Sequence, residues 1–186
     1  MIGYAITGSF CTHSASFSAL CKLREAGWEI QPIMSECAYS TDTRFGRAQD
    51  FILRIEDLCG REIIHTIKDA EPLGPHTPLD ALVIAPCTGN TLAKIANGIT
   101  DTAVTMAAKA HLRRDKTTLI ALASNDSMSQ NLTNIARLIT RKSVYFVRMC
   151  QDDPVAKPHS LVAQMSEIPE ALGKAMLGEQ MRPIFI

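Results

Sequence analysis

The sequence predicts an α/β protein with one doubly wound, Rossmann-like domain, in which helices cover both faces of a parallel sheet. Short apolar segments of the strand type alternate with amphipathic helical segments along the whole chain, as in parallel sheets. The sequence contains no internal repeat, low-complexity tract or linker. Its 186 residues provide for one domain with a proper core. We therefore expect residues 1–186 to form a single domain.

The expected strands are short runs of apolar and β-branched residues that end at glycine, serine or proline. Residues 81–85 (ALVIA) contain no polar side chain, which is typical of a strand buried on both faces. The final residues, PIFI, fit either a strand or an extended arm. The other expected strands cover Ile2–Thr7, Trp28–Met34, Thr117–Ala123 and Ser143–Arg148, with a further candidate at Ile63–Ile67.

The expected helices carry apolar side chains three and four residues apart, so that one face packs against the sheet. Ser14–Ala26 has Phe17, Leu20 and Cys21 at this spacing, and Gly27 ends it. Three prolines and a glycine make residues 68–80 a rigid connection between two elements. The other expected helices cover Gly46–Cys59, residues 88–98, Ala103–Leu112, Met128–Thr140 and Ile168–Leu177.

Charge and cysteine content argue against several classes of protein. Lys plus Arg and Asp plus Glu each total 19, so we expect no binding to nucleic acid or to an anionic membrane. No apolar run approaches the ~20 residues of a membrane-spanning helix, and the first residues lack the basic region of a signal peptide. We therefore expect a cytoplasmic location. The six cysteines and five histidines form no C-x-x-C or H-E-x-x-H pattern, so we expect reduced thiols and no metal site.

Small polar residues follow four of the expected strands. The carboxyl ends of parallel strands meet at one edge of the sheet, where ligands bind near the switch in strand order. Gly8 permits close approach of the backbone, and neighbouring hydroxyl and N–H groups suit an anion such as phosphate. Ordinary turns and helix caps explain the same residue types without a ligand. The candidate binding residues are Thr7, Gly8, Ser9, Ser35, Cys87, Thr88, Gly89, Asn90, Thr91, Ser124 and Asn125.

The segment after residues 81–85 carries the most chemical information. Pro86 ends the strand, and Cys87–Thr91 lead directly into a helix. These residues supply backbone N–H groups, hydroxyls and an amide without bulk or charge. They suit a flat heteroaromatic ligand with many hydrogen-bond acceptors better than they suit proton transfer. The chain after Gly8 has no further glycine of the dinucleotide-binding fingerprint, which argues against NAD(P) on this chain.

The first turn, Ser35 and the segment APCTGNTLAKIANGITD together resemble the FMN-binding flavoprotein family of cysteine decarboxylases. That family carries P-A-S-A-N-T followed by an A-K-I-A-N-G-I-x-D helix, and the resemblance extends to about residue 148. It implies an FMN cofactor whose phosphate would face Gly8, Ser9 and Ser35. The ribityl chain and ring would then lie along Thr88–Thr91.

The remaining strand-end residues are assigned to the same implied site. Thr7, Cys87 and Ser124 would complete the cofactor site. Asn90 and Asn125 would be the catalytic residues, because each presents an amide at the mouth, and the resemblance implies that Asn90 faces the substrate carboxylate.

Longer motifs resemble one group within this family over nearly the whole chain. They are AEPLGPxTPLD, VTMAAKAHLR, QDDPxxKPxSLVA and the PIFI ending. This narrower resemblance implies one component of a two-component synthase, in which a separate A subunit is the one that binds NAD(P). The complex would oxidise a small cyclic dicarboxylate to an aromatic product in the mother cell of a sporulating bacterium.

The chain also departs from the decarboxylases. The segment ALASNDSMSQN keeps Asn125 but lacks the proline and tryptophan of their P-x-M-N-x-x-M-W motif. Cys150 is followed by no glycine-rich flap, and we interpret it as a packed residue. His65 and His76 do not match the spacing of the family's active-site histidine. The alternatives are a free-standing FMN-dependent decarboxylase or prenyltransferase-like enzyme, and a non-catalytic assembly partner with a vestigial flavin cleft.

The sequence of residues 103–112 predicts that copies of this chain assemble with one another. Ala103, Met106, Ala107 and Ala110 share one face that would admit a neighbouring helix, while the flanking helices offer larger apolar faces to the sheet. We expect a homo-oligomer built on trimers, in which another chain completes the site around the two asparagines. His111, at the end of this segment, fits a cation that favours the helix C-terminus.

Overall fold

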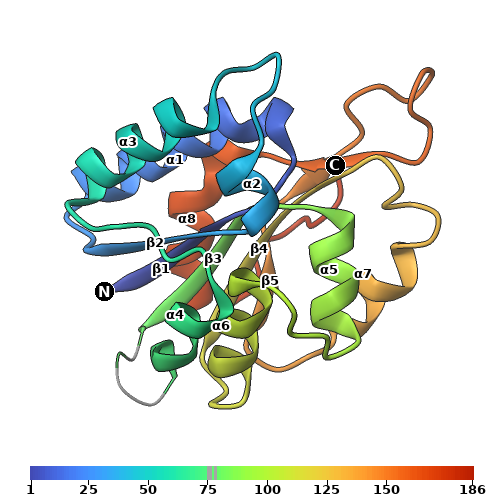
Figure 1. Ribbon diagram of the computed structural model, residues 1–186. Helices are drawn as coiled ribbons and strands as arrows, with labels where there is room; N and C mark the ends of the chain where they lie inside the picture. The colour runs from blue at the N-terminus through green and yellow to red at the C-terminus, as the bar shows by residue number, and fades with distance from the viewer. Residues whose placement is uncertain (75–76, 78) are drawn as a thin grey trace.

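The computed structural model describes residues 1–74, 77 and 79–186, which form a parallel sheet covered by helices (Figure 1). The strand order is β2-β1-β3-β4, with β5 beside β4, and all four of these neighbouring pairs are parallel. The order reverses between β1 and β3, so the carboxyl ends of these two strands form the switch point. The parallel strands are β1 Ile2–Ile6, β2 Ile30–Met34, β3 Ala81–Cys87, β4 Thr117–Ser124 and β5 Val144–Phe146.

Two short strands make the sheet mixed rather than wholly parallel. Leu161–Ala163 (β7) runs antiparallel to the end of β4, and Met149–Cys150 (β6) pairs antiparallel with β7. The chain reverses through the loop 151–160 between β6 and β7, and a reversal of this kind gives antiparallel neighbours. The expectation of a purely parallel sheet is therefore wrong at this edge.

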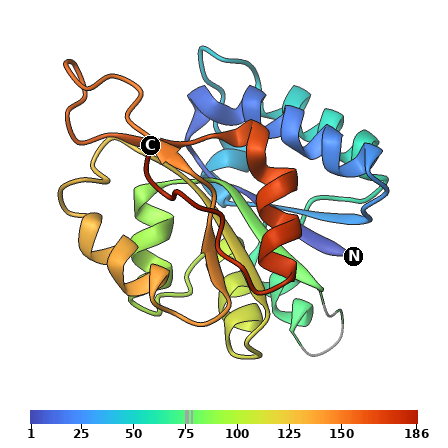
Figure 2. The same cartoon turned by 180° about the vertical axis from the view of Figure 1, so that it is seen from behind.

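The helices lie on both sides of the sheet, as Figures 1 and 2 show. On one side α1 packs against α8, and α3 lies against α1 and the edge strand β2. On the other side α6 packs against β3 and β4, and α5 lies between α6 and α7. The longer helices are α1 His13–Glu25, α3 Ala48–Cys59, α5 Gly89–Ala96, α6 Ala103–Leu112, α7 Leu132–Ile139 and α8 Ile168–Met176.

Short helical segments connect these elements. The expectation of a strand at 63–67 is wrong, because a single bridge joins Ile33 to Ile64 and the chain then turns into a short helix. Thr66 caps that helix by accepting a hydrogen bond from Asp69 N. The short segments are the helices α2 Glu36–Ser40 and α4 Ile67–Ala70, and the 3₁₀ turns η1 Phe10–Thr12, η2 Glu71–Leu73 and η3 Met165–Glu167.

The helix expected from Met128 begins four residues later, at Leu132. Asp126 holds the intervening residues in a turn, because its carbonyl oxygen accepts hydrogen bonds from Ser129 N and Asn131 N at 3.2 and 3.3 Å. Side chains of the Asx type stabilise such turns in preference to a helix. The turn matters for function because it lies directly after β4.

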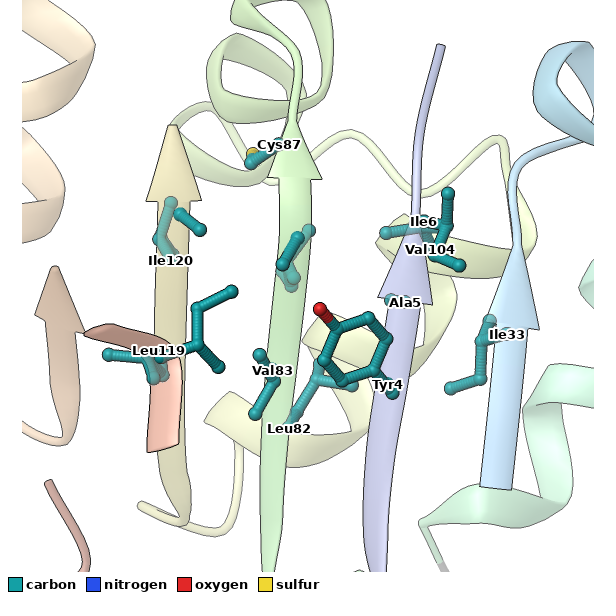
Figure 3. Packing of buried hydrophobic residues seen from close by; sticks show 14 of the residues in the cluster. Tyr4, Ala5, Ile6, Ile33, Leu82, Val83, Cys87, Val104, Leu119 and Ile120 are labelled. Carbon is teal, nitrogen blue, oxygen red and sulfur yellow. The ribbon is translucent and has the colours of Figure 1, made fainter. Parts of the chain in front are cut away.

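The core is made by strands that are apolar on both faces (Figure 3). Tyr4 and Ile6 of β1, Leu82 and Val83 of β3, and Ile120 of β4 are fully buried. This pattern is typical of parallel strands that helices cover on both sides. The one polar group of Tyr4 is satisfied, since its hydroxyl donates to the Ser16 carbonyl oxygen at 2.9 Å.

Helix α6 does not offer the free face that its sequence suggests. Ala103, Ala107 and Ala110 are 0, 2 and 5% exposed within the single chain. The segments α4 and η2, from the connection rich in proline, pack against α6 and cover part of its surface. The small residues therefore serve close packing inside the chain, and the argument that they await a second chain is wrong.

The C-terminal residues run beside β6. Met149 forms a bridge with Phe185, and the N–H of Ile186 donates to the Met149 carbonyl oxygen at 3.0 Å. The final segment is thus an extended arm that adds a single bridge to the sheet. Among the described residues, no helix is both long enough and apolar enough to cross a membrane.

Candidate functional site

Thr7 joins the ends of the two central strands. Its hydroxyl donates to the Pro86 carbonyl oxygen at 2.8 Å and accepts a hydrogen bond from Thr88 N at 2.9 Å. The side chain is 1% exposed, so both bonds lie in a medium where an unpaired group is costly. Thr7 thus fixes the switch point and has no hydroxyl left for a ligand.

Gly8, Ser9 and Ser35 lie near one another at this edge. A Cβ atom at Gly8 would come no closer than 3.5 Å to its neighbours, the nearest being Cys37 Sγ on α2. Ser35 caps α2, since its hydroxyl accepts from Ala38 N at 3.3 Å, while Ser35 N donates to the Ile6 carbonyl oxygen. The turn after β1 and the start of α2 therefore meet, and Ser35 also has the ordinary role of a helix cap.

The segment Cys87–Thr91 begins α5 at the end of β3. Cys87 is fully buried, and burial raises the pKa of its thiol well above the usual value, which makes it an inert packing residue. The Thr88 hydroxyl accepts from Thr91 N at 3.2 Å and donates to Thr91 Oγ1 at 3.1 Å, so these two threonines cap the helix. Asn90 is exposed beside them.

Gly89 fills a place where a side chain has no room. A Cβ atom there would collide with Ser124 Oγ, Asn131 Nδ2 and Asp126 Oδ1. The glycine therefore lets the start of α5 lie directly against the turn after β4. Sequence reasoning identified Gly89 as a ligand residue, whereas the structure shows a role in bringing two strand ends together.

Asp126 organises the turn after β4. Its carboxylate accepts hydrogen bonds from the Ser124 hydroxyl and, at 2.9 Å to each oxygen, from Asn131 Nδ2. Asn131 is 5% exposed, and its own carbonyl accepts from Asn134 Nδ2 at 2.9 Å. The network leaves Asn125 exposed at the mouth. Sequence reasoning included Asp126 in the candidate strand end 124–126 without giving it a role, and it missed Asn131.

A cavity of about 360 Å³ joins several predicted residues, and we call it the strand-end cavity. Ser9, Ser124 and Asn125 line it, together with Asp152 and Lys157 from the loop 151–160. Lys157 donates to Asp152 at 2.7 Å, and this hydrogen bond lowers the pKa of the carboxyl and raises that of the amine. Among the described residues that line the cavity, Lys157 is the one cation and Asp152 holds it, and sequence reasoning did not predict this pair at the site.

His13 is a further residue that sequence reasoning missed. Its Nε2 lies 2.8 Å from the carbonyl oxygen of Thr7, and its ring stacks on Phe51 with centroids 4.9 Å apart. Burial lowers the pKa of the imidazole below its ordinary value, so the ring is neutral at pH 7. Because the carbonyl only accepts, Nε2 carries the proton and Nδ1 keeps a lone pair.

The other candidates have structural explanations. Cys150 is partly buried in β6, where Gln164 Nε2 lies 2.7 Å from its sulfur, and no flap glycine follows it. His65 stacks on Tyr39 at 3.7 Å, and His76 lies outside the described residues. His111 is 4% exposed, and burial lowers the pKa of its imidazole to about 4. The interpretation of His111 as a helix-end cation is therefore wrong.

Comparison with protein families agrees with this geometry. The family described as Flavoprotein matches residues 1–174. The chain belongs to the flavoprotein family. Membership indicates flavin binding and a flavin-related catalytic role, which the strand-end geometry accommodates.

Two relatives of this flavoprotein confirm the narrower resemblance. It is 43% identical over 185 residues to the B subunit of dipicolinate synthase from Bacillus subtilis (strain 168), a match that covers 100% of this chain and 92% of the relative. The crystal structure of the B subunit of dipicolinate synthase from Bacillus halodurans C matches with 40% identity and a TM-score of 0.91, covering 100% of this chain and 95% of the other.

A more distant structure shows the same fold. The FMN-dependent cysteine decarboxylase SpaF is 24% identical, with a TM-score of 0.66 and coverage of 94% of this flavoprotein and 95% of SpaF. The expected α/β fold class is thereby confirmed.

Proposed function

We propose that this chain is the B subunit of a dipicolinate synthase. It would act with a separate NAD(P)-binding A subunit to oxidise a dihydrodipicolinate-type precursor to dipicolinic acid in the cytoplasm of a sporulating mother cell. The observation that carries the proposal is the 43% identity to such a protein along the full chain. The absence of a dinucleotide fingerprint after Gly8 agrees with an NAD(P) site on the partner.

FMN is the flavin that the residues fit best. At the β1 end, the Gly8 N–H and the hydroxyls of Ser9 and Ser35 are neutral groups that can donate to a phosphate, whereas the N–H groups of Ser9 and Ser35 already donate to the carbonyl oxygens of Thr7 and Ile6. A Cβ atom at Gly8 would make ordinary van der Waals contacts with Cys37 Sγ at 3.5 Å and with Phe10 at 3.7 Å, so the glycine leaves the space of one methyl group beside the backbone. The adjoining cavity of about 360 Å³ lies within the range of small-molecule pockets. When bound, FMN would supply redox chemistry at this mouth.

The chain's own residues would hold the substrate at the mouth of the strand-end cavity. Asn90 and Asn125 are exposed, and they follow Gly89 and Ser124, the two residues that meet where the start of α5 lies against the turn after β4. An amide N–H₂ donates to a carboxylate and remains uncharged, so it orients a dicarboxylate without requiring a pKa shift. Lys157, which is paired with Asp152 at 2.7 Å, is a cation at this cavity that a bound carboxylate could approach.

The proposal predicts a division of labour that reconstitution tests. Dipicolinate formation would be measured with each of the two subunits in isolation and with both together, in the presence of NAD(P). We expect rapid formation with both subunits only. Activity of the isolated chain would instead identify a free-standing flavin enzyme. If the A subunit reaches the full rate on its own, the chain is an assembly partner.

We also infer a homo-oligomer, with the mouth around Asn90 and Asn125 completed by another copy. The small residues of α6 are buried within the single chain, so the helix face that the sequence suggested cannot form the contact between copies. Other surfaces have to form it. One such surface lies near the loop 151–160, where Val155 is 93% exposed. Met128 is also exposed and lies beside this loop, because its N–H donates to the His159 carbonyl oxygen. Light scattering should show a trimer or a multiple of it, and a monomer at micromolar concentration would refute this.

A further inference from the structure

A second cavity, which we call the α1–α3 cavity, lies beside the strand-end cavity. It is bounded by the first turns of α1 and α3 and by the loop 41–47, which connects α2 to α3 in Figure 1. Its volume is about 220 Å³, and Cys11 lines both cavities. A ligand here would be small and would lie next to the proposed flavin site.

The lining of the α1–α3 cavity is rich in positive charge. Arg47 and Arg54 line it, against the single carboxylate of Asp50. In the described part of the chain neither guanidinium takes part in an ion pair. The guanidinium of Arg54 lies 4.3 Å from the ring centroid of Phe17, which holds it in place.

The two helices that begin at this cavity add to the positive potential. Neither α1 nor α3 has an N-cap side chain that bonds to its first turn, although Asp42 accepts from Ala48 N at 2.8 Å. The N-terminus of a helix carries a partial positive charge. The Asp42 carboxylate partly offsets this charge at α3, so the two guanidiniums and the start of α1 are the groups that favour an anionic ligand.

Aromatic rings form the apolar walls. Phe10 and Phe51 line the cavity on either side of His13, with ring centroids 5.1 and 4.9 Å from that imidazole. Phe45, on the loop 41–47, also lines it and is 56% exposed. Exposed phenylalanine is unfavourable in water, and rings of this kind bind the faces of flat ligands. The cavity therefore suits a planar ligand.

His13 contributes an acceptor. Its Nε2–H is held by the Thr7 carbonyl oxygen at 2.8 Å, so the neutral ring has a lone pair on Nδ1. The described residues provide no hydrogen-bond partner for Nδ1, and this atom is not among the buried unsatisfied ones, so solvent or a ligand reaches it. It can accept a hydrogen bond from a ring N–H.

We propose that the α1–α3 cavity binds a small planar aromatic or dihydroaromatic carboxylate through Arg47 and Arg54, with its ring against the aromatic side chains of the wall. Under the proposed function, on which this assignment rests, the precursor and the product of the synthase are ligands of this class, and the α1–α3 cavity is a second position for them beside the mouth of the strand-end cavity. The cavity then places a dicarboxylate beside the flavin edge of the sheet.

Calorimetric titration of the isolated chain at low salt tests the proposal. The probes are pyridine-2,6-dicarboxylate, isophthalate, which keeps both carboxylates, and 2,6-dimethylpyridine, which has none. We expect both dicarboxylates to bind and dimethylpyridine not to bind. The double variant Arg47→Gln/Arg54→Gln should lose affinity at least about tenfold, since hydrogen bonds to charged groups are lost.

Matched control variants distinguish binding in the α1–α3 cavity from a general effect of removing positive charge from the chain. Arg113→Gln/Arg141→Gln removes two exposed arginines elsewhere and should change the affinity less than about twofold. Phe45→Ala tests the wall independently and should also weaken binding. Thermal unfolding of each variant checks that the chain remains folded.

Three results would overturn the assignment. They are equal affinity of the Arg47→Gln/Arg54→Gln variant and the wild type, no binding of either dicarboxylate, and a loss of affinity in Lys157→Gln but not in the arginine variant. The last result would place the ligand in the strand-end cavity. Reconstitution with the A subunit judges the proposed function separately, because dipicolinate formation by the complex can occur whichever cavity holds the carboxylate.

Discussion

Thr7 and Thr88, 81 residues apart in the chain, are joined by a hydrogen bond of 2.9 Å from the Thr88 backbone N–H to Thr7 Oγ1. The same hydroxyl donates to the Pro86 carbonyl oxygen, so one side chain locks the ends of β1 and β3 together. Since Gly8 and Ser9 follow one strand and Asn90 follows the other, this lock fixes both halves of the proposed flavin site.

Thr7→Val should destabilise the chain and weaken flavin binding together. Valine keeps the shape but leaves Thr88 N without its acceptor, which costs about 1–3 kcal/mol, while the Pro86 carbonyl oxygen keeps its hydrogen bond from Thr7 N at 3.2 Å. Urea unfolding would measure the first effect and fluorescence titration with FMN the second. Thr117→Val, at the start of β4 and far from the Thr7 hydroxyl, is the control and should change stability by less than about 0.5 kcal/mol. Equal stability of Thr7→Val and the wild type would disprove the lock.

Gly89→Ala should destabilise the chain, against the usual preference of helices for alanine. The added methyl group meets Ser124, Asp126 and Asn131, and overpacking of this kind costs about 1–3 kcal/mol. Gly173→Ala in α8 is a matched control, because nothing lies within 4 Å of its Cβ position. That substitution should be neutral or stabilising by up to about 1 kcal/mol. If both changes have the same effect, the contact at Gly89 has no energetic importance.

Asn90→Ala should weaken ligand binding with little change in stability. The side chain is exposed at the first turn of α5 and makes no hydrogen bond in the described part of the chain. We expect the affinity for FMN to fall about tenfold, from the loss of the hydrogen bond that the amide would make to the flavin. Asn97→Ala, at the other end of α5, should leave affinity unchanged. A variant that unfolds, yet binds normally in its folded fraction, would make Asn90 structural.

His111 predicts a pH dependence of stability. Burial lowers the pKa of this imidazole to about 4, below the ~6.5 of an unfolded chain, so the folded state resists protonation. The stability contributed by the neutral ring is therefore complete above pH 6.5 and is lost as the pH falls toward 4. The loss amounts to about 3 kcal/mol. Urea unfolding from pH 7 to 4 should show a smaller slope in His111→Gln, and identical slopes would contradict the prediction.

The sequence alone determined the alternation of strands and helices and the strand-end position of the candidate residues. An apolar run such as residues 81–85 is stable as a strand that helices cover on both faces. The alternation of such runs with amphipathic helices along the chain therefore fixes the fold class. It did not determine where β5, β6 and β7 begin, because short edge strands depend on pairing with partners elsewhere in the chain.

The tertiary structure decided which polar residues are free for a ligand. Thr7 and Ser35 look alike in sequence, yet the Thr7 hydroxyl bonds between two strands while that of Ser35 caps a helix. Contacts of this kind join residues far apart in the chain, so no local pattern of residue types specifies them. The same reason explains why His13 and Lys157 were missed, since their neighbours at the two cavities come from segments brought together only by folding.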